Sequence, residues 1–138
     1  MIAVVDTCVI IDYLQGRQPF FSGAKRVFMA AANKRFEGFV TAKAITDIYY
    51  LMHRSFHDAD RTKNAVRAIM TLFSVADTLA EDSLRALDSG IADYEDALMV
   101  ESAKRIGADC IITRNEKDYM RAGIPIYDPE AFISLLDE

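Results

Sequence analysis

The chain has 138 residues, of which 51% are hydrophobic and 27% charged, and its formal net charge at pH 7 is -5. This length suits one domain with its own core, spanning residues 1–138, and the composition excludes a disordered or low-complexity chain. The negative charge argues against a protein whose whole surface attracts nucleic acid. It does not exclude a nucleic-acid enzyme whose acids gather at one site.

The N-terminal residues, the apolar runs and the two cysteines indicate where in the cell the protein is expected. Met1 leads straight into the apolar run IAVV, with no basic segment and no cleavage pattern of a signal peptide. Apolar runs elsewhere are far shorter than the roughly 20 residues that span a bilayer. We therefore expect a cytoplasmic protein that does not enter a membrane. Cys8 and Cys110 lie far apart inside apolar runs, where a thiol behaves as a small hydrophobic group.

Short apolar runs alternate with helical patterns along the chain. The runs predict buried strands at residues 2–5, 36–41, 73–76, 109–113 and 124–127. Apolar residues at helical spacing, with capping residues, predict helices at about 7–16, 19–35, 42–53, 58–73, 78–90, 93–107 and 129–136. Asp58 or Asp60 is expected to cap the fourth of these helices, and Thr78 with Glu81 to form a capping box at the fifth. Parallel strands need crossover connections, which are usually helical. The alternation therefore predicts an α/β fold, a three-layer α/β/α sandwich around a five-stranded parallel sheet.

Acidic side chains stand where strands end or helices begin. Asp6 directly follows the first strand, Asp96 lies in the first turn of the helix that begins after Asp93, and Asp118 follows the fourth strand. Asp47 flanks the apolar stripe of the third helix. Because the carboxyl ends of parallel strands meet at one edge of a sheet, Asp6 and the residues after the fourth strand are expected to face one crevice.

Each acid also has a purely structural explanation. Asp93 is a preferred helix N-cap, and Asp96 would complement the helix dipole in the first turn. Asp47 would be a solvated edge residue, and Asp118 would cap a turn before Gly123. Only the combination of acids indicates a shared site.

Carboxylates that share a site raise one another's pKa unless a cation neutralises them. Oxygen ligands without His or Cys favour Mg²⁺ or Mn²⁺, and we expect one or two such ions. The chemistry that follows is attack by a metal-activated water on a phosphodiester.

In their order and spacing these motifs resemble the PIN domain family, in particular the VapC-like bacterial ribonucleases. The resemblance covers nearly the whole chain. It rests on DT at Asp6 and Thr7, TAKAITDIYY with Asp47, DYEDAL with Asp96, and IITRNEKDY with Thr113, Asn115 and Asp118.

The resemblance implies a PIN-like fold and a metal-dependent endoribonuclease, the toxin of a toxin-antitoxin pair, inhibited by a small antitoxin protein and often dimeric. It implies that the catalytic, metal-binding acids are Asp6, Asp47, Asp96 and Asp118. Residues expected to orient these acids are Thr7, Thr113, Asn115 and Asp93. Basic side chains near the acids in the sequence are predicted to hold the RNA phosphates, and they are Lys43, Arg54, Arg114 and Lys117.

The chain departs from the family pattern at three positions. Asn115 stands where many members carry Asp, Cys8 where many carry Asn, and Asp47 where many carry Glu. Asp118 would supply the carboxylate that Asn115 lacks. Asn115 and Cys8 favour an alternative interpretation, a non-catalytic PIN-like module that binds RNA or acts as a scaffold with a degraded metal site.

Other α/β proteins with an acid after the first strand fit less well. Phosphatases with an aspartyl nucleophile resemble D-x-D there, but Cys8 occupies the second acidic position. Receiver domains carry a Lys after the fifth strand, where this chain has Tyr127 and Asp128. The glycine pattern of a dinucleotide-binding fold is absent.

Overall fold

A five-stranded parallel sheet forms the centre of the computed structural model, which describes all of residues 1–138. The strands are β1 (Ile2–Val5), β2 (Glu37–Thr41), β3 (Ser74–Ala76), β4 (Cys110–Ile112) and β5 (Ile126–Tyr127), in the spatial order β3-β2-β1-β4-β5. Every neighbouring pair is parallel. The predicted sheet is confirmed, although each predicted strand except the first is longer than the observed one.

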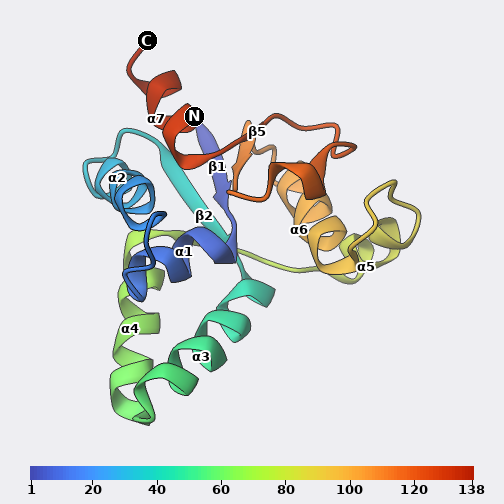
Figure 1. Cartoon of the computed structure of the whole chain (residues 1–138). Coiled ribbons are helices and arrows are strands. Elements are labelled where there is room, and N and C mark those ends of the chain that lie inside the picture. The colour runs from blue at the N-terminus through green and yellow to red at the C-terminus, as the bar shows by residue number, and fades with distance from the viewer.

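Helices cover both faces of this sheet, as Figure 1 shows. They are α1 (Thr7–Leu14), α2 (Phe21–Ala32), α3 (Ala42–Phe56), α4 (Ala59–Leu72), α5 (Ala80–Leu87), α6 (Tyr94–Arg105) and α7 (Pro129–Leu136), with a short 3₁₀ turn η1 at Glu116–Tyr119. Helices α1, α2 and α7 lie on one side of β1, and α5 and α6 lie on the other (Figure 1). The predicted three-layer sandwich is therefore confirmed.

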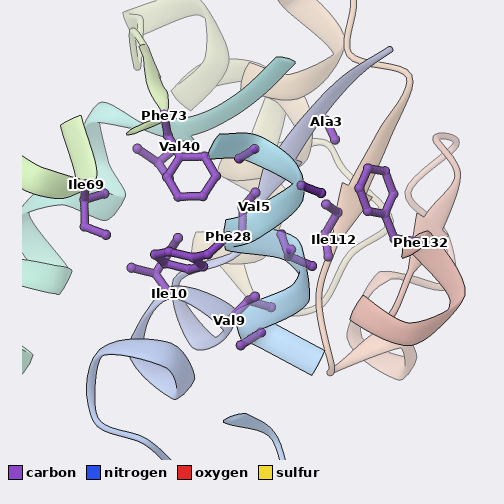
Figure 2. Close-up of a cluster of buried hydrophobic side chains, with 14 of the residues drawn as sticks. Ala3, Val5, Val9, Ile10, Phe28, Val40, Ile69, Phe73, Ile112 and Phe132 are labelled. Atoms are coloured by element: carbon purple, nitrogen blue, oxygen red, sulfur yellow. The ribbon is translucent and has the colours of Figure 1, made fainter. Parts of the chain in front are cut away.

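The larger hydrophobic core lies between the sheet and α1, α2, α3, α4 and α7. Ala3 and Val5 of β1 and Ile112 of β4 point into it, because alternate residues of a strand face the same side. Figure 2 shows how Phe28, Phe73 and Phe132, which come from distant parts of the chain, lie around these strand residues; the figure also labels Val9, Ile10, Val40 and Ile69.

A smaller core lies on the opposite face. Val4 of β1 and Ile111 of β4 point toward α6, where Ala97, Val100 and Ala103 are buried. The same cluster contains Tyr119 of η1, of which only 1% is exposed. This face therefore brings the turn after β4 against α6, one of the helices with a predicted site residue.

Local capping predictions were right at two helices and wrong at one. The side chains of Asp58 and Asp93 accept hydrogen bonds from the first turns of α4 and α6. Asp128 caps α7 in the same way, although the sequence indicated only Pro129 in its first turn. The predicted capping box of Thr78 with Glu81 is not formed, because Asp82 accepts the Leu79 amide instead. Helix α2 begins at Phe21 rather than at Pro19.

The strand order creates a crevice at the carboxyl ends of β1 and β4. The chain passes from β1 outward through β2 to β3, and then returns to the other side of β1 for β4 and β5. Its crossovers on the two sides run over opposite faces of the sheet (Figure 1), which is the arrangement that opens a ligand crevice in α/β folds. None of the helices has the length and hydrophobicity needed to cross a membrane.

Candidate active site

Asp6 lies at the crevice between β1 and β4, where its carboxylate is held by several donors. The Thr113 hydroxyl donates to Oδ2 of Asp6 at 2.8 Å, and the Cys8 thiol donates to the same oxygen at 3.5 Å. Burial and the Asp6 charge raise the pKa of Cys8 to about 12, so the thiol stays protonated. Thr113 in turn accepts the amide of Asn115, which fixes the direction of its hydroxyl. All of these side-chain donors contact Oδ2 of Asp6, and none of them contacts Oδ1.

Tyr119 connects Asp6 to Asp96 across the crevice. Its phenol oxygen lies 2.8 Å from Oδ1 of Asp96 and 3.3 Å from Oδ2 of Asp6. Burial and the two carboxylates raise the pKa of Tyr119 far above its ordinary value, so the phenol remains a donor. A hydroxyl has one proton to donate. Tyr119 therefore stabilises the carboxylate of Asp96, at the shorter distance, more than that of Asp6. Two acids from elements 90 residues apart in sequence thus share one hydroxyl.

The pKa of Asp96 reflects first its burial and then the acids around it. Burial raises the pKa of Asp96 to about 6, and the charges of Asp93, Asp6 and Asp118 raise it in the same direction. The hydrogen bond from Tyr119 acts oppositely but does not offset them. The site therefore holds Asp96 in a state that favours a proton or another cation.

This raised pKa predicts a pH-dependent stability change in the metal-free protein. A carboxyl whose pKa is higher in the folded than in the unfolded chain stabilises the fold most below its ordinary pKa of 3.8, and the stabilisation is lost as the pH rises through about 6. Asp96→Asn should therefore unfold at a higher temperature than wild type at about pH 8 and at the same temperature at about pH 4. Glu101→Gln on the same helix is the control. An equal gain at both pH values would contradict the prediction.

A cavity of about 360 Å³ opens beside these acids between α3 and α6. Asp6, Asp47 and Asp96 all line it, so three of the four predicted acids face one cavity. Asp47 accepts a hydrogen bond from Lys43 at 2.7 Å, and the same ammonium lies 3.1 Å from Glu95. Burial acts to lower the pKa of Lys43, but these two acids more than offset it and hold the pKa above its ordinary value. Lys43 therefore remains charged inside the cavity.

The fourth predicted acid lies farther away. Asp118 is exposed on η1, accepts no hydrogen bond, and lines a separate surface pocket with Asp93 and Lys117. Its charge still reaches Asp96, whose pKa it raises. Asp93 caps α6 through the Asp96 amide, which is the structural role that its position predicted.

The remaining predicted residues are divided between the cavity and other surfaces. Thr7, Lys43 and Arg54 line the cavity. Arg114 instead forms a partly buried ion pair with Asp12 at 2.7 Å and lies over the Phe20 ring. Lys117 lies outside the cavity.

Two residues with direct contacts in the site were not singled out from the sequence. Tyr119 is the last residue of η1, and an aromatic residue there is explained equally well by packing in the smaller core. The role of its hydroxyl depends on contacts with distant residues. Glu95 lies in the first turn of α6, between the helix cap Asp93 and the predicted metal ligand Asp96. In the sequence it looks like an ordinary solvent-exposed residue. Only the approach of α3 to α6 reveals that Glu95 shares Lys43 with Asp47.

The donor set fits a hard divalent cation held by two carboxylates. No three His, Cys, Asp or Glu side chains are grouped closely enough to enclose an ion by themselves. Mg²⁺, however, usually takes only one or two protein carboxylates and completes its shell with water and phosphate oxygens. Asp6 and Asp96, which share one phenol and each keep an oxygen without a protein donor, match that requirement.

Several solved structures have a similar fold. A chain of a toxin-antitoxin complex from Klebsiella pneumoniae is 22% identical, with a TM-score of 0.68, over 92% of this chain and 97% of that one. A chain of VapBC2 from Rickettsia felis, bound to a DNA fragment from its promoter, is 12% identical, with a TM-score of 0.69, over 93% and 98%. VapC20 of Mycobacterium tuberculosis, a toxin that cleaves the sarcin-ricin loop, is 17% identical, with a TM-score of 0.62, over 79% and 86%. At these identities the likeness concerns the fold.

Sequence comparison gives the family. Curated proteins provide no match to the chain. The family model described as the PIN domain matches residues 3–117, which include the carboxyl ends of β1, β2 and β4 and the acids Asp6, Asp47 and Asp96. With most of its length matched by that model and a fold like those of VapC proteins, the chain belongs to the PIN domain family.

Proposed function

We propose that this protein is a metal-dependent endoribonuclease that hydrolyses RNA phosphodiester bonds. The observation that carries the proposal is the pairing of Asp6 and Asp96 through one phenol, at the mouth of a cavity that Asp47 also lines. Such a gathering of acids is unfavourable unless a cation or proton neutralises it. A protein that needed only stability would gain little from it.

Asp6 and Asp96 are the residues proposed to hold Mg²⁺ or Mn²⁺. When bound there, such an ion lowers the pKa of a coordinated water and neutralises charge on the phosphate. Thr113 and Tyr119 hold the two carboxylates in place through hydrogen bonds of 2.8 Å. We assign Asp118 a weaker role, in which its charge strengthens the negative field at Asp96 without direct contact.

Arg54 is the basic residue best placed to receive RNA. It is exposed at the cavity that Asp6 and Asp96 line, and it forms no ion pair within the protein. The Tyr50 ring, 62% exposed, lines the same cavity one helical turn before it. Proteins that bind single-stranded nucleic acids combine cationic groups, which contact the phosphates, with exposed aromatic rings, on which the bases stack.

We further propose that the protein is a toxin neutralised by an antitoxin. The similar chain from Klebsiella pneumoniae belongs to a toxin-antitoxin complex, and VapC20 is a sarcin-ricin loop cleaving toxin. A small partner that covers the cavity would block access to Asp6 and Asp96. Dimer formation is part of the same proposal, with exposed Tyr50 available for contact, whereas Phe56 packs under Arg61 and is less accessible.

Cleavage of a single-stranded RNA with Mn²⁺ tests the proposal. We expect the purified protein to shorten the RNA when Mn²⁺ is present and to lose this activity when a chelator removes the ion. A matched DNA strand measures the preference for RNA. RNA left intact with both Mg²⁺ and Mn²⁺ would contradict the nuclease assignment.

The absence of a closed three-carboxylate group favours a second candidate, a PIN-like module that binds RNA or acts as a scaffold without catalysis. The two candidates differ in metal binding. A module would bind RNA equally well with and without Mn²⁺ and would bind no Mn²⁺ at millimolar concentrations.

A further inference from the structure

Lys43 joins two acids that belong to different helices. Its ammonium nitrogen lies 2.7 Å from Oδ2 of Asp47, one turn further along α3, and 3.1 Å from Oε1 of Glu95 on α6. Figure 1 shows α3 and α6 as separate helices on two sides of the sheet end. A lysine paired only within its own helix would be an ordinary surface contact. Pairing within one helix does not explain the second contact of Lys43, which reaches Glu95 across the cavity.

The cavity therefore contains two acidic pairs with different partners. Asp6 and Asp96 share the neutral phenol of Tyr119, which supplies a hydrogen bond but no positive charge. Asp47 and Glu95 share the Lys43 ammonium, which supplies both. The first pair still lacks a counter-charge, and the second already has one.

A protein-derived cation and a divalent ion compete for the same place. Two-metal nuclease sites hold their ions about 4 Å apart, with carboxylates neutralising both. Besides Asp6 and Asp96, the carboxylates that line the cavity are Asp47 and Glu95, and the Lys43 ammonium lies between these two. A second ion in the cavity would have to take its ligands from them. Repulsion between that ammonium and an incoming dication would disfavour a second ion.

We infer that Lys43 takes the place of a second metal ion, so that the chain binds one divalent ion, at Asp6 and Asp96. This inference rests on the proposed nuclease site and specifies its composition. Lys43 is then a positioning residue that holds Asp47 and Glu95 together across the cavity. It is not primarily a contact for RNA.

Counting bound Mn²⁺ tests the inference without measuring activity. Wild-type protein is titrated with Mn²⁺, the free ion is followed by electron paramagnetic resonance, and one ion per chain is expected. Lys43→Met leaves Asp47 and Glu95 without their cation, and this variant should bind a second Mn²⁺. The double variant Lys43→Met with Asp47→Asn should return to one ion. Lys25→Met, an exposed lysine on α2 without an ion pair, is the control for loss of charge.

The outcomes separate the inference from the function it rests on. Two ions in the wild type, or one ion in a folded Lys43→Met variant, would overturn the role of Lys43 and leave the nuclease proposal standing. No Mn²⁺ binding by the wild type would overturn both. Circular dichroism of each variant ensures that a changed count reflects the cavity and not unfolding.

Discussion

Asp6→Asn is expected to lower the rate of metal-dependent RNA cleavage by more than about 100-fold, because even groups that only orient metal ligands contribute about 10- to 100-fold. Asn keeps the size of the side chain and can still accept from Thr113, so the fold should persist. What is lost is the negative charge at the end of β1. The measurement is the initial rate of cleavage of a labelled single-stranded RNA with Mn²⁺.

Two further variants are expected to lower the cleavage rate less than Asp6→Asn does. Thr113→Val removes the hydroxyl that holds Asp6, and a loss of about 10- to 100-fold is expected. Asp118→Asn removes a charge that acts on Asp96 from outside the cavity, and a smaller loss than either is expected. Cleavage by Asp6→Asn at the wild-type rate would show that a contaminant or another site cleaves the RNA.

The largest stability effect is expected at Asp82, away from the proposed chemistry. This side chain is fully buried and accepts from the Leu79 amide, the Ser102 hydroxyl and Nε of Arg105, all within 3.2 Å. Asp82→Ala removes the acceptor for three donors and leaves the Arg105 charge partly buried. Loss of one partner of a buried ion pair typically lowers the free energy of unfolding by about 3 kcal/mol or more.

The effect of Asp82→Ala should depend on pH. Burial raises the pKa of Asp82, but the hydrogen bonds from Arg105, Leu79 and Ser102 more than offset this and hold the pKa below its ordinary value of 3.8. A carboxylate with a lowered pKa stabilises the fold above 3.8, and the stabilisation disappears as the pH falls through the lowered value. Chemical denaturation should therefore show a large difference from wild type at neutral pH and a smaller one in strong acid.

A control at the end of the same helix separates this network from helix propensity. Asp88 is exposed and follows the last turn of α5, so Asp88→Ala should change the free energy of unfolding by no more than about 0.5 kcal/mol. Equal destabilisation by Asp82→Ala and Asp88→Ala would contradict the assignment. Since the network joins α5 to α6, its loss would also loosen the helix that carries Asp96.

Features that depend on neighbouring residues could be predicted from the chain alone. Apolar runs and helical spacing predicted a parallel five-stranded sheet between helices, because burial on both faces leaves that signature in each segment. Asp93 was identified as a helix cap because capping involves only the next three residues. The position of Asp6 at the crevice followed from a strand followed at once by a helix. Even this local reading failed at α5, where Asp82 and not Thr78 or Glu81 completes the cap, since Ser102 and Arg105 on another helix fix its position.

The partners of the acids, in contrast, depend on how distant elements pack together. The bond between Tyr119 and Asp96, and the contact of Lys43 with Glu95, join segments separated by 23 and 52 residues, and no local pattern records them. Arg114 illustrates the same point: it neighbours Thr113 in sequence, yet it pairs with Asp12 on α1. A side chain can point to either side of the element that carries it, and the packing of distant elements selects the side. For that reason the chain indicated Asp6, Asp47 and Asp96 as candidates, while the part of Glu95 and the partners of these acids could be recognised only from the fold.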